Sequence, residues 1–126
     1  MLDEGNADEI IAGHDIVVDA LDNVEARLVL EKACEKAGMP MVHGAINGWN
    51  GQVAVAMPGS GMMTQLYGQG GADVGNSSNP SFTPAVVSGL QAAEVIKVLL
   101  EREEALKDRL LIIDLLGHEY EIIDFN

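Results

Sequence analysis

The order of hydrophobic and polar positions predicts short strands alternating with helices. Asp15–Asp19 is a β-branched apolar run, typical of a strand buried on both faces. In Asn23–Ala37 apolar side chains recur roughly every three to four residues, which predicts an amphipathic helix ended by Gly38. The other predicted elements are helices at Asn6–Ala12 and from Pro84 to about Leu106, the latter capped by Thr83, and strands at Met41–Ile46, Gln52–Met57, Arg109–Leu115 and Glu119–Ile123.

Two longer segments stand out from this alternation. The helix after Pro84 is apolar almost all round between Ala85 and Leu100, which predicts burial on more than one side. Residues 58–80 are rich in glycine and show no period, so we expect a long loop that is functional, mobile or covered. We expect no membrane-spanning segment, because no run approaches the ~18 consecutive apolar residues of a span.

Composition narrows the class of protein. The 126 residues contain 7 Lys and Arg against 20 Asp and Glu, so the net charge is 7 − 20 = −13, and 48% are hydrophobic. Such a chain forms a core and is of single-domain size. Its negative charge disfavours nucleic-acid binding. One cysteine excludes an intrachain disulfide framework, and the acidic N-terminus is unlike a signal peptide, so we expect a cytoplasmic protein.

The charge is distributed unevenly. Residues 37–93 contain one charged side chain, Asp73. This stretch could be an interior sheet followed by a loop, or a surface covered by a partner, since exposed surfaces normally carry more charge. Both interpretations stay open.

The junction after Asp19 is the main candidate site. Asp22 lies where a predicted strand gives way to a helix, and ligands of open α/β sheets bind at the carboxyl ends of strands. A carboxylate there could hold Mg²⁺ and a nucleotide phosphate. Alternatively, Asp22 and Glu25 are a helix N-cap and its N3 acid. Arg27 could share the site with Asp22 or form a surface pair with Glu31.

Cysteine and histidine offer weaker candidates. Cys34 falls on the apolar stripe of the first long helix, where core packing is expected. His14, His43 and His118 lack metal-ligand spacing, but His43, at a strand end, could line a cleft.

Four strings of residues together resemble the E1-like adenylyltransferases (ThiF, MoeB and HesA), relatives of the ubiquitin-activating enzymes. They are DIVVDALDN-x3-R at 15–27, GMPMVHGA at 38–45, GQV at 51–53 and TPAVVSGLQAAEVIK at 83–97. The resemblance covers nearly the whole chain. It implies an α/β, Rossmann-like adenylation fold, of which residues 1–126 correspond to the C-terminal part: sheet strands with two main helices, then closing antiparallel strands.

The resemblance also implies a function. The family uses ATP and Mg²⁺ to attach AMP to the C-terminal Gly-Gly carboxylate of a ubiquitin-like sulfur carrier of thiamine or molybdopterin biosynthesis. Asp22 would contact Mg²⁺ and ATP, Asn23 and Arg27 would lie beside the nucleotide, and Asp22 and Arg27 would be catalytic. The family also implies a homodimer, whose apolar face would account for the weakly charged middle of the chain.

The sequence departs from the family in two ways. It has no counterpart of the half that carries the GxGxxG loop and the phosphate-contacting cations, so we expect the isolated chain to be inactive. With Cys34 alone there is no family zinc site, and no cysteine in residues 58–83 for a thioester. Two alternatives remain: a non-catalytic dimerisation or carrier-binding module, and half of a Rossmann oxidoreductase, which the DN-x3-R string disfavours.

Overall fold

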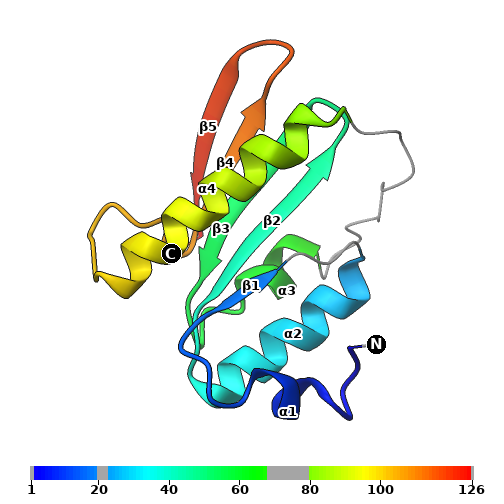
Figure 1. Cartoon of the computed structure of the whole chain (residues 1–126), viewed down its shortest axis with the longest axis vertical. Coiled ribbons are helices and arrows are strands. Elements are labelled where there is room, and N and C mark those ends of the chain that lie inside the picture. The colour runs from blue at the N-terminus through cyan, green and yellow to red at the C-terminus, as the bar shows by residue number, and fades with distance from the viewer. Residues whose placement is uncertain (1, 20–22, 68–79, 126) are drawn as a thin grey trace.

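A five-stranded sheet with helices on both faces organises the chain (Figure 1). The computed structural model describes residues 2–19, 23–67 and 80–125. The strand order is β1-β2-β3-β4-β5; β1 and β2 are parallel and the other neighbours antiparallel. The elements are α1 Ala7–Ile11, β1 Val17–Asp19, α2 Val24–Ala37, β2 Met41–Asn47, β3 Asn50–Ala56, α3 Met62–Tyr67, α4 Phe82–Leu99, β4 Arg109–Asp114 and β5 Glu119–Asp124.

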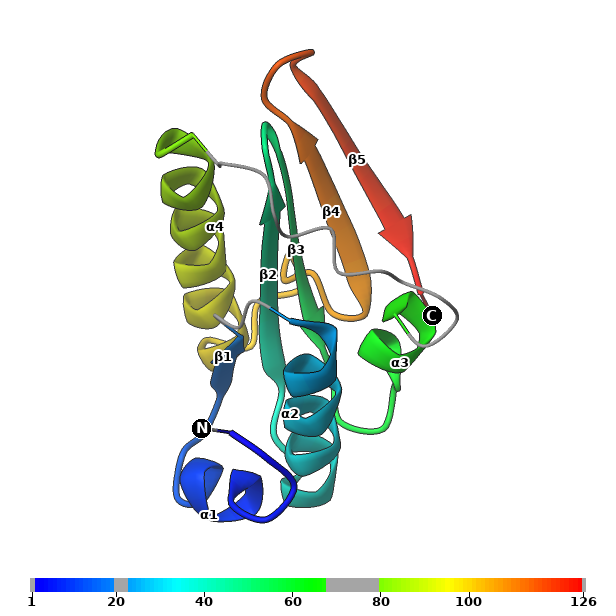
Figure 2. The same cartoon turned by 90° about the vertical axis from the view of Figure 1, so that its right-hand side faces the viewer.

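The core lies on both faces of the central strands β2 and β3. Alternate residues of a strand point to opposite faces, so Met41 and Ala54 pack on the side of α2 and α3. Val42 and Val53 point the other way and pack against Val87 of α4. Figure 2 shows α4 on one side of the sheet and α2 with α3 on the other. The interior-sheet interpretation of the weakly charged stretch is therefore confirmed for β2 and β3.

Helix α4 is buried on one side only. Thr83, Val87, Gln91 and Glu94 are its buried residues, whereas Leu100, just beyond its end, is 68% exposed. The expected burial on more than one side is wrong within this chain. The outward apolar residues at its C-terminal end are Ile96, Leu99 and Leu100.

By length and composition, α4 also meets the requirements of a membrane span. Its 18 residues have a mean hydropathy of 1.3, and it is the one such helix among the described residues. The helix contains Gln91, Glu94 and Lys97, so it is no run of ~18 consecutive apolar residues, and the expectation that the chain has no membrane-spanning segment stays a prediction. The match is weak evidence for a membrane, because core helices of soluble proteins meet the same test.

Both ends of α4 differ from the prediction. Ser81 is the N-cap residue, and Thr83 lies inside the helix, where its hydroxyl donates a 2.8 Å hydrogen bond to the carbonyl of Gly48. The helix ends at Leu99 instead of near Leu106, because the chain turns at Glu101, whose φ is 56°. No glycine or proline marks that turn.

The edge strands are the least buried. Val18 of β1 is 47% exposed, so the expected burial of this strand on both faces is wrong. All six residues of β5 are exposed, including Tyr120 at 65%, which agrees with the predicted edge strand.

Within the predicted loop 58–80, the structure contains the short helix α3. Residues 68–79 of that predicted loop lie outside the described residues.

Candidate functional site

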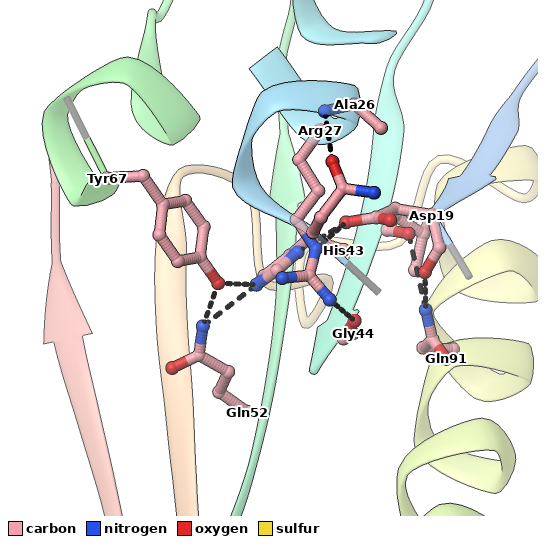
Figure 3. Close-up of polar contacts among 10 residues, drawn as sticks. Asp19, Ala26, Arg27, His43, Gly44, Gln52, Tyr67 and Gln91 are labelled. Atoms are coloured by element: carbon pink, nitrogen blue, oxygen red, sulfur yellow. Dashed lines mark hydrogen bonds and ion pairs between the residues drawn. The ribbon is translucent and has the colours of Figure 1, made fainter. Parts of the chain in front are cut away.

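Asp19 is the centre of a buried polar network at the carboxyl end of β1 (Figure 3). Its side chain is fully buried, and its Oδ2 atom lies 3.1 Å from Nε of Arg27 and 2.6 Å from Nδ1 of His43. The parallel register sets Asp19 opposite His43, while the first turn of α2 supplies Arg27. Because Arg27 is only 7% exposed, its charge is balanced inside the protein by this carboxylate.

The other ring nitrogen of His43 faces Gln52 and Tyr67. The Gln52 amide nitrogen lies 2.7 Å from the Tyr67 hydroxyl and 2.9 Å from Nε2 of His43; the hydroxyl lies 3.2 Å from the same Nε2. A carboxylate only accepts, so Nδ1 of His43 donates to Asp19. The amide nitrogen of Gln52 is a donor, so Nε2 of His43 is its acceptor in this arrangement.

Tyr67 reaches this network because α3 is anchored to α2. The buried carboxylate of Glu31 accepts hydrogen bonds from the backbone N–H groups of Met63, at 2.5 Å, and Thr64, at 3.1 Å, and from the Thr64 hydroxyl at 2.7 Å. The Tyr67 ring then lies with its centroid 5.7 Å from the Arg27 guanidinium, within cation–π range.

Two of the three predicted site residues lie in the described part of the chain. Asn23 is the N-cap of α2 and its side-chain oxygen accepts a 2.7 Å bond from the N–H of Ala26, so the alternative in which Asp22 caps the helix is wrong. Asp22 itself lies outside the described residues. The alternative surface pair of Arg27 with Glu31 is also wrong, since both side chains are buried with other partners.

Of the two weaker candidates, the prediction for His43 is wrong and the prediction for Cys34 is confirmed. His43 has no exposed surface, so it does not line a cleft. Cys34 is 2% exposed within the core beside Leu30 and Ala33, which confirms the packing interpretation. Burial, with the nearby carboxylates of Glu31 and Asp19, raises the pKa of the Cys34 thiol from 9.0 to about 11.

The described residues form no metal site by themselves, and Asp22 as a magnesium ligand stays a prediction. Oδ2 of Asp19 is already bonded to Arg27 and His43, and no cluster of three or more His, Cys, Asp or Glu side chains suited to a metal occurs among residues 2–19, 23–67 and 80–125. A single carboxylate is compatible with Mg²⁺ bound mainly through water and nucleotide phosphates.

The network was only partly visible in the sequence. Asp19 and Arg27 belong to the motif string, whereas Gln52 and Tyr67 were missed as site residues. The adjoining GQV string marked the position of Gln52 without indicating its role, and no periodic signal marked Tyr67.

Comparison with known proteins decides the family. The family model described as the ThiF family matches residues 1–126, the whole chain. The chain belongs to the ThiF family. Among ThiF-family relatives, the SAMP-activating enzyme E1 of Haloferax volcanii is 33% identical over 98% of this chain and 48% of its own length. The sulfur carrier protein adenylyltransferase of Thermus thermophilus is 38% identical over 88% of this chain and 45% of its own.

Solved structures agree on the ThiF-family fold. A crystal structure of E. coli MccB with ATP superposes with a TM-score of 0.72 at 16% identity, covering 98% of this chain and 40% of MccB. PaaA superposes with a TM-score of 0.73 at 11% identity, over 98% and 39%. These matches confirm the predicted α/β adenylation fold. The chain spans about half, or less, of the length of the relatives it matches.

Proposed function

We propose that this ThiF-family chain is the C-terminal part of an ATP-dependent adenylyltransferase that activates the C-terminal carboxylate of a ubiquitin-like sulfur carrier. The family match over residues 1–126 is the observation that carries the proposal. Relatives named for sulfur-carrier or molybdopterin-synthase adenylylation support it, the latter including the Haemophilus influenzae protein at 35% identity.

The proposed reaction is acyl-adenylate formation. A carboxylate oxygen of the carrier attacks the α-phosphorus of ATP, the bond to the β-phosphate oxygen breaks, and pyrophosphate leaves. Asp22 would hold a Mg²⁺ ion, which would supply neutralisation of the charge that develops on the phosphates. Asn23 and Arg27 would border the nucleotide from the start of α2.

The buried network supports a site at this place. Asp19, which also binds His43, holds the guanidinium of Arg27 near the carboxyl end of β1, where ligands of open α/β sheets bind. In the part of the chain that the structure describes, Arg27 is the one Lys or Arg side chain of this network. Triphosphate binding requires more cationic groups than this, so we infer that the isolated 126 residues lack adenylylation activity.

We further propose a homodimer and a carrier of the thiamine or molybdopterin type. The apolar residues that α4 presents outward, together with Trp49 and Phe82, support an interface on this side of the sheet.

The test is a titration of Mg-ATP into the protein purified from the cells that naturally express it. Wild type is compared with Asp22→Ala and with the matched control Asp15→Ala, which removes an exposed acid before β1. We expect Asp22→Ala to abolish or strongly weaken binding and Asp15→Ala to leave it unchanged. Equal binding by wild type and Asp22→Ala would reject the site assignment; absent binding in wild type would favour the non-catalytic module instead.

A second measurement concerns the isolated chain. We expect no carrier-dependent exchange of pyrophosphate into ATP by residues 1–126 alone, and detectable exchange would overturn the inferred inactivity.

A further inference from the structure

Gln91 connects α4 to the ends of two strands. This side chain is 8% exposed, and its Nε2 atom donates to the carbonyl of Asp19, at 3.0 Å, and to that of Val42, at 3.4 Å. Asp19 is the last residue of β1, and Val42 lies in β2, the parallel neighbour of that strand. One amide therefore links the end of β1 to β2 from a helix 72 residues further along the chain.

The amide fits because residue 44 is a glycine. A Cβ atom built on Gly44 would lie 2.3 Å from the side-chain carbonyl carbon of Gln91 and 2.5 Å from its nitrogen, closer than real atoms approach. The carbonyl of Gly44 also accepts a 3.5 Å hydrogen bond from Nη2 of Arg27. Gly44 thus admits Gln91 on the α4 side of the sheet and binds Arg27 through its main chain.

Asp19 is consequently held twice, by different groups and from different helices. Arg27 of α2 binds its carboxylate, and Gln91 of α4 binds its carbonyl (Figure 3). The contact with Arg27 fixes the side chain of Asp19, whereas the contact with Gln91 fixes its main-chain carbonyl.

We propose that Gln91 is a positioning residue for the candidate nucleotide site, and that Gly44 is required to admit its amide. Gln91 fixes the end of β1 and thereby the position of Asp19, whose carboxylate binds Arg27. The expected effect on nucleotide binding rests on the proposed function, whereas the expected effect on the end of β1 does not.

The first experiment replaces the amide by an apolar group of similar length, Gln91→Met, and measures amide hydrogen exchange. We expect the β1 amides of residues 17–19 to exchange at least about tenfold faster, with β3 and β4 unchanged, because a local contact is lost without global unfolding. The control is Gln65→Met, the same substitution at an exposed glutamine of α3. Should Gln91→Met not fold, Gln91→Asn, which shortens the amide by one methylene, replaces it.

The second experiment tests the pairing with Gly44. Gly44→Ala should speed β1 exchange in the wild-type background, because the new methyl displaces the Gln91 amide. In a Gln91→Ala background the space is open, so the same substitution should change exchange less than about twofold. Equal effects of Gly44→Ala in both backgrounds would overturn the proposed fit.

The third measurement is the dissociation constant of Mg-ATP in the naturally expressed protein. We expect Gln91→Met to raise it on the order of tenfold, the low end of the effect of removing a residue that orients a ligand-contacting group, while the thermal midpoint stays closer to wild type than that of Asp19→Asn. Faster β1 exchange with unchanged Mg-ATP affinity would overturn the positioning role. If wild type binds no Mg-ATP, the proposed function fails. The hydrogen-exchange data alone then decide whether Gln91 holds the end of β1.

Discussion

Replacing Asp19 by asparagine tests the buried network most directly. The substitution preserves size but leaves the Arg27 guanidinium, 7% exposed, without its counter-charge. Removing one partner of a buried ion pair costs ~3–5 kcal/mol. We expect about 3 kcal/mol here, the low end, because the asparagine oxygen can still accept one hydrogen bond. A domain of this size has on the order of 10 kcal/mol of unfolding free energy, so the variant should remain folded.

Urea denaturation of the isolated chain, followed by circular dichroism, measures this loss. With a slope of about 1.5 kcal/mol per molar urea, the midpoint should fall by about 2 M. The matched control is Asp8→Asn, which breaks the exposed pair with Lys36 and should leave the midpoint unchanged. Adding Arg27→Met to Asp19→Asn should restore part of the loss, since the guanidinium that lacks a counter-charge is then also removed. A loss below about 1 kcal/mol, or no recovery in the double variant, would show that Arg27 is not balanced by Asp19.

Three further predictions follow from packing, anchoring and titration. Gly51→Ala should lower the free energy of unfolding by about 1–3 kcal/mol in urea denaturation, because its Cβ would lie 2.5 Å from a methyl of Val87. Gly89→Ala has open space around it in mid-helix and should raise the free energy of unfolding by about 0.5–1 kcal/mol. The reverse order of the two effects would contradict the packing of α4. Glu31→Ala should speed amide exchange throughout α3 while the sheet stays protected, and unchanged exchange there would refute its anchoring role. Because the pKa of Cys34 is raised in the folded protein, the unfolded chain loses the thiol proton first as pH rises. The free energy of unfolding of wild type should therefore fall, relative to that of Cys34→Ala, by about 1.4 kcal/mol per pH unit between pH 9 and about 11. Parallel pH profiles of the two proteins would contradict the shift.

Local signals predicted most of the elements. The helix that ends at Gly38 was predicted within one residue, because amphipathic spacing and a left-handed glycine, φ 69°, mark it clearly. α3 was missed because a six-residue helix held by the distant Glu31 has no period of its own. The C-terminal end of α4 was placed too late, since its stop depends on the turn at Glu101 and no residue there is a helix breaker by type.

The candidate site was less predictable than the fold. Asp19 and Arg27 lie eight residues apart, within one motif string, and could be singled out locally. Gln52 and Tyr67 meet His43 only through strand pairing and the placement of α3, which are long-range properties of the packed chain. Likewise, the motif string that contains Gln91 can be recognised in the sequence, but the contact of Gln91 with Asp19, 72 residues away, cannot be predicted from it.

The strand order also bears on how the molecule assembles in time. The hairpins β2–β3 and β4–β5 each close through a short turn, whereas β3 and β4 are joined by a long connection that contains α3 and α4. β1 joins β2 by a parallel crossover through α2, and its last residue is bound by Gln91 from 72 positions away. Because distant contacts form more slowly than near ones, we expect the two hairpins to form first, and the β3–β4 pairing and the bond from Gln91 to Asp19 to form late. The attachment of α4 to the end of β1 would then be completed at a late stage of folding and opened at an early stage of unfolding.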